Sequence, residues 1–285
     1  MSSLRALRRR IKSVQSTQQI TKAMEMVAAA KLRRAQLRAT AARPYAARIT
    51  AMLDSLAGAA AELDHPLFKA REVQRTALVL VTADRGLCGG YNSTLVRAAE
   101  QRLRAAEPGA TQLVLVGRKG RDYFRRRKFP VLATHTPVPA EASLEFARML
   151  TRDLMARFIA GEIDRVELMF TEFISALRRK VQVQTFLPVG AAREAGPAAS
   201  DVTIFEPDAE SIFAELLPRY ATAKLFAALA DALASEHGAR MIAMGAARKN
   251  AGELIDLLVL RRNRMRQASI TKELLEIVGG AEALR

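Results

Sequence analysis

The stretch LRALRRRIKSVQSTQQITKAMEMVAAAKLRRAQ (residues 4–36) decides the architecture, because its apolar side chains recur at alternating steps of three and four. The pattern continues to residue 56 and is apolar at thirteen of its sixteen positions. Such a stripe is typical of a helix that packs along a second helix. It predicts one helix over residues 3–58, bent where Pro44 removes a backbone hydrogen bond. The stripe comprises Leu4, Leu7, Ile11, Val14, Gln18, Thr21, Glu25, Ala28, Leu32, Ala35, Ala39, Ala42, Ala46, Ile49, Leu53 and Leu56.

A second stripe with the same spacing occupies the last third of the chain. It predicts a helix over residues 209–283, with a bend near Pro218. Two such helices separated by a compact domain favour one antiparallel coiled coil formed by the two ends of the same chain. The second stripe comprises Tyr220, Ala223, Ala227, Ala230, Ala234, His237, Met241, Met244, Arg248, Ala251, Ile255, Leu258, Arg262 and Met265.

Between the two helices the hydrophobic period changes to short apolar runs, of which TALVLVT (76–82) and TQLVLVG (111–117) are typical of buried parallel strands. Strands that alternate with helices predict a doubly wound, Rossmann-like α/β domain. We therefore expect an N-terminal coiled-coil helix (1–58), an α/β domain (73–205) and a C-terminal coiled-coil helix (209–285). The other expected strands are 129–135, 167–174 and 181–187, and the expected helices are 92–106, 120–127 and 141–159.

The formal net charge of +16 is concentrated in the first helix, because residues 1–58 hold twelve Lys or Arg against two acidic residues. Residues 59–239 contribute only +2 of the total. A dense positive charge on a helix is either a solvated face or a surface that attracts an acidic partner. That partner is either nucleic acid or an acidic protein loop.

A glycine-rich segment, TADRGLCGGYNST (82–94), follows the first expected strand and resembles a phosphate-binding loop. It lacks both the G-x-G-x-x-G spacing and the G-K-[ST] motif, so we expect no nucleotide there. The simpler interpretation is a tight turn that needs Gly86, Gly89 and Gly90 for their backbone freedom.

No catalytic, cofactor-binding or metal-binding residues are expected. The single cysteine, Cys88, excludes an internal disulfide and fits a reducing compartment, and without a histidine partner it is predicted to be a small buried residue. His65, His135 and His237 lack metal-ligand spacing. No run of 18 apolar residues is present, and the basic start carries the heptad stripe, so we expect neither membrane insertion nor a cleaved leader.

Two features of the end helices point to surfaces beyond simple packing. The polar positions Gln18, Thr21 and Glu25 fall together in the first stripe, where they weaken the seam. The last residues, LLEIVGGAEAL (274–284), are apolar on several faces at once and are expected to project beyond Met1. A solitary helix without a polar face predicts an apolar sleeve formed by another protein.

Four segments resemble the gamma subunit of F-type ATP synthases, and the likeness is collinear from residue 4 to 284. They are RIKSVQSTQQITKAMEMVAAAKLRRAQ (10–36), TADRGLCGGYNS (82–93), ASEHGARMIAM (234–244) and NRMRQASITKELLEIVGGAEAL (263–284). The resemblance implies the central rotor shaft, which makes no covalent bond and couples proton transport to ATP synthesis by transmitting torque.

The same resemblance implies the partners. The terminal helices turn inside a ring of alternating alpha and beta subunits, and the α/β domain forms a foot joined to the epsilon subunit and the membrane c-ring. One copy per complex is expected, peripheral at the cytoplasmic face of a bacterial inner membrane, with no nucleic acid bound.

Carried over residue by residue, the resemblance implies four groups of contacts. The coupling interface with beta falls on Lys22, Met24, Glu25, Arg33, Arg34, Arg240, Arg266, Gln267 and Thr271. The bearing tip includes Leu275, Val278 and Leu284, and the candidate foot contacts are Tyr91, Phe205 and Glu206. The chain departs from the family at Arg262-Asn263, where Tyr-Asn is common, and at the basic run Ala-Arg-Lys-Asn (247–250).

Two rival functions account for part of the sequence. A coiled-coil nucleic-acid-binding protein explains the basic helix, because phosphate binding needs little more than clustered Lys and Arg. It does not explain the apolar C-terminal tip or the near-neutral middle domain. A nucleotide-binding enzyme built on the α/β domain is disfavoured by the incomplete glycine-rich motif.

Overall fold

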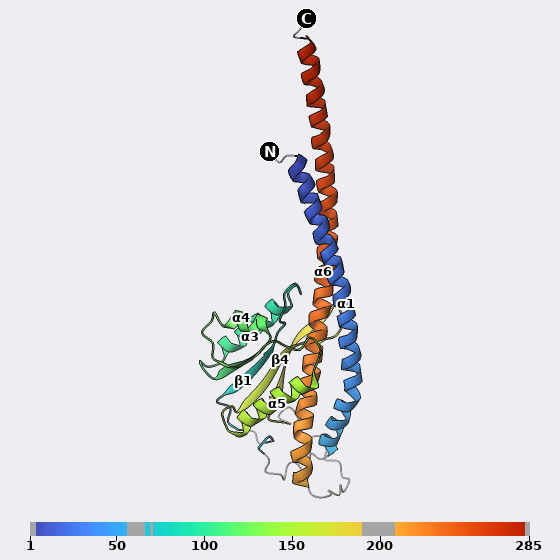
Figure 1. Cartoon of the computed structure of the whole chain (residues 1–285). Coiled ribbons are helices and arrows are strands. Elements are labelled where there is room, and N and C mark those ends of the chain that lie inside the picture. Colours follow the sequence, from blue (N-terminus) through green and yellow to red (C-terminus); the bar gives the residue numbers. More distant parts are fainter. Residues whose placement is uncertain (1–3, 56–65, 69–70, 190–208, 283–285) are drawn as a thin grey trace. The chain divides into compact units, whose positions relative to one another are not determined.

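The computed structural model describes residues 4–55, 66–68, 71–189 and 209–282. Contacts divide the chain into two compact units, residues 1–28 with 241–285 and residues 29–240. The elements are α1 (Leu4–Ser55), β1 (Thr76–Val81), α3 (Tyr91–Ala105), β2 (Thr111–Val116), α4 (Arg118–Phe124), β3 (Val131–His135), α5 (Leu144–Ile159), β4 (Arg165–Phe173), β5 (Arg179–Leu187) and α6 (Ala209–Glu282) (Figure 1). Both long helices and the alternating strands and helices predicted from the sequence are confirmed.

The five strands form one sheet in the order β3-β2-β1-β4-β5. Strands β1 to β4 pair in parallel, whereas β5 pairs antiparallel with β4 because the chain turns back between them without a crossover helix. The doubly wound α/β domain is therefore confirmed, with one antiparallel edge strand. Strand β1 is central, and residues 77–81 are fully buried, as expected for a strand covered on both faces.

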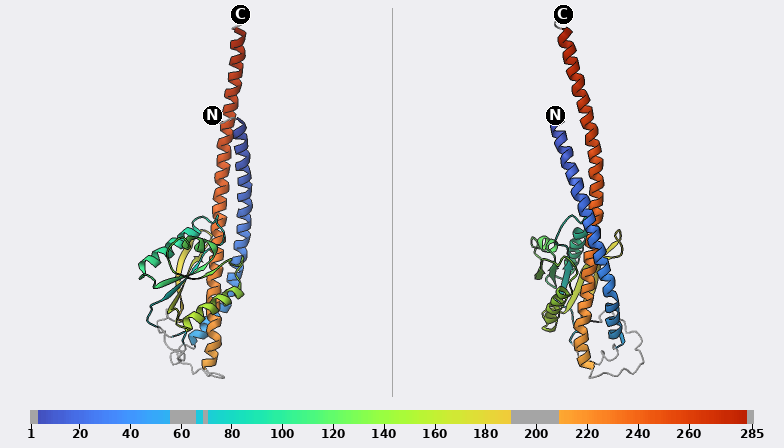
Figure 2. Two further views of the ribbon diagram at one scale, coloured as in Figure 1. Left: turned by 60° about the vertical axis from the view of Figure 1, so that its left-hand side comes forward. Right: turned by 45° about the vertical axis from the view of Figure 1, so that its right-hand side comes forward.

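Helices cover both faces of the sheet and give it two cores. On one face, Val79 and Val114 pack with Leu150 of α5 and with Leu217 of α6. On the opposite face, Leu78 and Leu113 belong to a core with Leu95 of α3 and Phe124 of α4. Figure 2 shows α3 and α5 on opposite sides of the sheet. The alternation of side chains along each strand divides the two cores.

In the other unit the first residues of α1 pack against α6 as an antiparallel pair (Figure 2). Leu7, Ile11 and Leu258 form its buried core, and Met265 is partly buried against them. Every predicted stripe position of α1 whose burial is described is buried or half-buried, which confirms the seam. The second stripe has two exposed positions, Ala227 and Arg248.

Pro44 and Pro218 lie inside α1 and α6, and neither helix ends there. Among the described residues, no helix combines the length and the apolar character that a membrane span requires.

Candidate coupling surfaces

The polar layer of the first stripe is accommodated by glycines on α6. A Cβ atom at Gly252 would lie 3.1 Å from Nε2 of Gln18, and one at Gly245 would lie 3.1 Å from Oε1 of Glu25. Gln18 and Glu25 are seven residues apart on α1, and the glycines that face them are seven residues apart on α6 in the opposite order. Larger residues at these two glycines would compete with the polar side chains for the same space. The polar layer therefore fixes the axial register of the coiled coil.

Glu25 also has an ionic partner on the facing helix. The Arg248 Nε atom donates to Oε2 of Glu25 over 2.9 Å. The side chains of Arg248 and Glu25 are 46% and 29% exposed. The glutamate that the resemblance assigns to a beta contact is thus held inside the coiled coil, and its partner belongs to the basic run 247–250.

We expect this ion pair to contribute less than about 1 kcal/mol, because both groups are partly exposed to solvent. Arg248→Ala should lower the free energy of unfolding by that amount, and Glu25→Gln by a similar one. A double-mutant cycle on the purified chain, measured by urea denaturation at low and high salt, isolates the coupling. The control is Lys249→Ala, whose side chain is 78% exposed and 3.9 Å from Glu253. A coupling energy of zero at low salt would show that the pair does not form.

The remaining lower-contact residues lie on the surface of α1 or close to it. Lys22 and Arg33 are exposed, and Met24 is half-buried. Arg34 is also exposed, and its guanidinium lies 3.9 Å from the Glu141 carboxylate, which pairs more closely with Arg38. Lys22, Arg33 and Met24 are therefore open to a partner, whereas Arg34 shares an acidic neighbour within the chain.

The upper-contact residues near the end of α6 are exposed. They are Arg266, Gln267 and Thr271. In the tip, Leu275 is 67% exposed, and its neighbours Leu274 and Ile277 are 58% and 68% exposed. The Val278 side chain and Leu284 lie outside the described residues, as do the predicted foot contacts Phe205 and Glu206.

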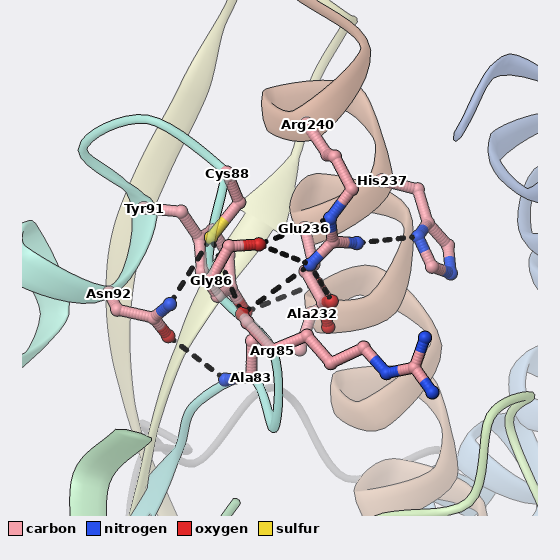
Figure 3. A network of polar contacts seen from close by, with 10 residues as sticks. All are labelled: Ala83, Arg85, Gly86, Cys88, Tyr91, Asn92, Ala232, Glu236, His237 and Arg240. Atoms are coloured by element: carbon pink, nitrogen blue, oxygen red, sulfur yellow. Dashed lines mark hydrogen bonds and ion pairs between the residues drawn. The ribbon is translucent and has the colours of Figure 1, made fainter. Parts of the chain in front are cut away.

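Arg240, the remaining upper-contact residue, is enclosed in a network within this chain (Figure 3). Its guanidinium donates to Oε1 of Glu236 over 2.6 Å and to the Gly86 carbonyl over 3.3 Å. It also donates to Nδ1 of His237 over 3.3 Å. The Arg240 and Glu236 side chains are only 11% and 12% exposed. Arg240 therefore fastens the glycine-rich turn (residues 85–90) to α6.

Burial sets the protonation states of the groups around Arg240. It raises the pKa of Glu236, although Arg240 opposes the shift. It also lowers the pKa of His237 to about 4, with Arg240 and Lys31 adding to the effect. His237 is therefore neutral at physiological pH and accepts the hydrogen bond from Arg240.

Cys88 and Tyr91 serve packing beside the same turn. The Cys88 thiol is buried, accepts from Nδ2 of Asn92 over 3.2 Å, and has its pKa raised by burial. Such a thiol is a poor nucleophile, in agreement with the expectation from the sequence. The Tyr91 hydroxyl donates to the Ala232 carbonyl over 3.1 Å. Because the Tyr91 ring is buried, a foot contact here would have to use exposed neighbours such as Leu87.

A cavity of about 280 Å³ lies beside the glycine-rich turn at the carboxyl end of β1, where doubly wound sheets commonly bind ligands. Both carboxylates that line it are engaged. Asp84 accepts from the backbone amides of Arg118 and Val138, each over 2.8 Å, and Glu236 is held by Arg240. In the part of the chain that the structure describes, no cluster of His, Cys, Asp and Glu could hold a metal ion.

Comparisons with known proteins agree over the full length. A family model described as ATP synthase matches residues 3–284. The ATP synthase gamma chain of Moorella thermoacetica is 49% identical over 285 residues, with 100% of both chains covered. That of Desulforamulus reducens is 49% identical over 284 residues, again with 100% of both covered.

Solved structures support the same fold. A chain from the central stalk and c-ring of the Tetrahymena thermophila mitochondrial ATP synthase is 26% identical, with a TM-score of 0.62, and the match covers 80% of this chain and 99% of that one. A chain of the Euglena gracilis mitochondrial ATP synthase is 20% identical, with a TM-score of 0.71 and coverage of 99% and 94%. The second likeness concerns the fold alone.

An antiparallel pair of long end helices on either side, in sequence, of a doubly wound α/β domain is the class of fold that this chain shares with the central-stalk chain of the Tetrahymena enzyme. The chain belongs to the ATP synthase gamma chain family. It is accordingly a subunit of the ATP synthase complex, and the subunit is not itself catalytic.

Proposed function

We propose that the chain is the central-stalk rotor subunit of an F-type ATP synthase. It transmits torque between the membrane c-ring and the catalytic ring of alpha and beta subunits, and so couples proton transport to ATP synthesis. Residues 1–58 and 209–285 form the shaft, and residues 73–205 form the foot. The observation that carries the proposal is family membership over residues 3–284. It is supported by α6, a helix of 74 residues that passes without a break through both compact units.

A single long helix suits this task because its 74 residues, at a rise of about 1.5 Å each, make one continuous rod of roughly 110 Å. The α1–α6 seam adds a second helix, and the glycines opposite Gln18 and Glu25 prevent the two from sliding. Twist applied at one unit would therefore be carried along both helices of the coiled coil.

Contact with the ring is proposed to use the outer faces of the coiled coil. Ile20, Met26 and Val27 of α1 are 60%, 64% and 56% exposed, and Leu257 and Leu260 of α6 are 64% and 56% exposed. Apolar side chains in this number on an exposed surface favour a protein partner. Lys22 lies among the apolar residues of α1, and Arg266 follows those of α6. Both cations are exposed and suit acidic loops of the beta subunit.

The foot is proposed to bind the epsilon subunit and the c-ring, with one copy of the chain per complex. The complex would place the chain peripherally at the cytoplasmic face of a bacterial inner membrane. Relatives in bacteria at 49% identity support this assignment.

Met24→Lys tests the coupling surface. Met24 is half-buried on α1 beside Glu25. A flexible thioether makes adaptable contacts that form and release as the shaft turns. A lysine could pair with an acidic beta loop in one rotational state only, and a contact that differs between states makes the rotational landscape uneven. We expect folding and assembly to be kept, and the ratio of protons pumped to ATP hydrolysed, measured in membranes, to fall several-fold.

Met24→Leu is the control, since it is apolar and of similar volume and should be close to neutral. Equal pumping ratios for the lysine variant, the leucine variant and the wild type would remove Met24 from the coupling surface.

A further inference from the structure

The cavity of about 280 Å³ beside the glycine-rich turn is lined by positive charge that its carboxylates do not offset. Both carboxylates are engaged, one by Arg240 and the other by backbone amides. Three further cations line the cavity, Lys31 of α1, Arg85 of the turn and Arg118 of α4. Within the residues that the structure describes, none of these three side chains forms an ion pair. All three are exposed, and exposed cations are ordinarily just solvated, so a site here needs a second, buried feature.

A buried donor supplies that feature. His237 is only 6% exposed, and its Nδ1 atom accepts from Arg240, so the proton of the neutral ring is on Nε2. Among the described residues this N–H finds no acceptor. Unlike Nε2 of His135, which is closed off from solvent, it remains accessible. His237 lines the cavity of about 280 Å³ and an adjoining one of about 130 Å³, and Lys31 lines both as well. The N–H and the ammonium group therefore share the space where the two cavities meet.

The charges around this space act on one another. The pKa of His237 is lowered first by burial and then by the positive charges of Arg240 and Lys31. Figure 3 shows the guanidinium of Arg85 on the same side of Arg240 as the His237 ring. A water molecule could accept from Nε2, but it would leave the positive potential of the lining uncompensated. An anion satisfies the buried donor and the surrounding charge together.

We propose that this space binds one small oxyanion of the phosphate class, inorganic phosphate or pyrophosphate. Its oxygens accept hydrogen bonds from Nε2 of His237 and from Nζ of Lys31, and Arg85 and Arg118 supply further positive charge. At about 30 Å³ for each water-sized group, the larger cavity has room for roughly nine, as many as the non-hydrogen atoms of pyrophosphate. A whole nucleoside triphosphate would not fit.

The bound anion would join three parts of the same compact unit. Lys31 belongs to α1, His237 to α6, and Arg85 and Arg118 to the loops at the carboxyl ends of β1 and β2. An anion held by all of them would fasten the first helix to the α/β domain.

The test is calorimetric titration of the full chain with pyrophosphate, without magnesium and at constant ionic strength. We expect one pyrophosphate per chain. Lys31→Gln should weaken binding at least about fivefold, because a charge-assisted hydrogen bond is lost. The matched control is Lys12→Gln, which removes an exposed lysine of the same helix outside the cavity and leaves the same net charge. No binding at millimolar pyrophosphate, or equal weakening by both substitutions, would overturn the proposal. ATP binding more tightly than inorganic tripolyphosphate would also overturn it, since the base would then be recognised.

Nitrogen NMR of the histidine rings locates the anion. The chain has three histidines, and loss of one signal in His237→Gln assigns that of His237. Pyrophosphate should shift the Nε2 signal of His237 more than that of His135, whose Nε2 is closed off from solvent. In the Lys31→Gln variant the same shift should need correspondingly more pyrophosphate. A one-to-one complex that leaves the His237 signal unchanged would overturn the proposal, because the anion would then lie elsewhere.

Discussion

Gly117→Ala is expected to prevent stable folding of the α/β domain. Gly117 follows β2 with a φ of +100°, a conformation that side chains rarely adopt. A Cβ atom there would lie 2.1 Å from the backbone carbonyl oxygen of Thr82. No rotamer can relieve a clash with backbone, so the ends of β1 and β2 would have to separate. We expect a loss of more than about 4 kcal/mol, which is a large share of the stability of an ordinary domain.

Gly109→Ala is the matched control for this substitution. Gly109 also has a positive φ, +86°, but a Cβ atom there would meet nothing within 4 Å. The control should therefore lose only the conformational term, about 1–2 kcal/mol. Soluble yield and thermal unfolding of the two purified variants compare them directly. Equal losses would show that the close approach of Gly117 to Thr82 is not the cause.

Arg240→Met is expected to destabilise the chain by about 3–5 kcal/mol at pH 8, because it leaves Glu236 buried without its cation. The glycine-rich turn would also lose the donor to its Gly86 carbonyl. Urea denaturation of the purified chain measures the change. Replacing both partners, as Glu236→Gln with Arg240→Met, should recover much of the loss, since no buried charge then remains.

The stability lost in the Arg240→Met variant should depend on pH in a direction that follows from the pKa of Glu236. Burial already raises the pKa of Glu236, and removing Arg240 takes away the largest opposing influence. The folded variant would then bind a proton at higher pH than the unfolded chain does, so its stability falls as pH rises. The deficit relative to wild type should be small near and below the ordinary glutamate pKa of about 4.3. The deficit should grow as pH rises from there through the raised pKa that Glu236 has in the folded variant. A stability deficit that is equal at pH 5 and pH 8 would show that the unpaired charge of Glu236 is not its cause.

Periodicity predicted most of the fold because burial leaves a regular mark on the sequence. The run 76–82 was expected as a strand and is β1, Thr76–Val81, buried on both faces. The stripe of α1 was expected from its heptads and is the buried face. Apolar period does not specify strand direction, however, and the antiparallel pairing of β5 depends on the short turn after β4.

The polar contacts between elements were harder to predict, because they join residues far apart in sequence. Arg240 meets the Gly86 carbonyl across 154 residues, and periodicity carries no information on that contact. One signal was present: Glu236 and Arg240 are four residues apart on one helix, a spacing at which opposite charges pair. A second signal was the spacing of seven shared by Gln18 and Glu25 and by Gly245 and Gly252, which marks complementary layers of a coiled coil.

Contacts with partner subunits stay predictions for a physical reason. The exposure of Lys22, Arg266 and Thr271 makes them available to a partner, but exposure alone does not identify one. For Glu25 and Arg240 a beta contact would have to compete with the internal pairs to Arg248 and Glu236.

The central claim, that this chain is the rotor, is tested most directly by watching it turn. Cys88 is 2% exposed, so a cysteine introduced at the exposed Arg126 of the foot can carry a bead. The chain is assembled with the alpha and beta subunits of the same organism, and the ring is fixed to a surface. On addition of ATP we predict one labelled chain per complex and continuous rotation of the bead in one direction. A stoichiometric complex that hydrolyses ATP while the bead stays still would contradict the account.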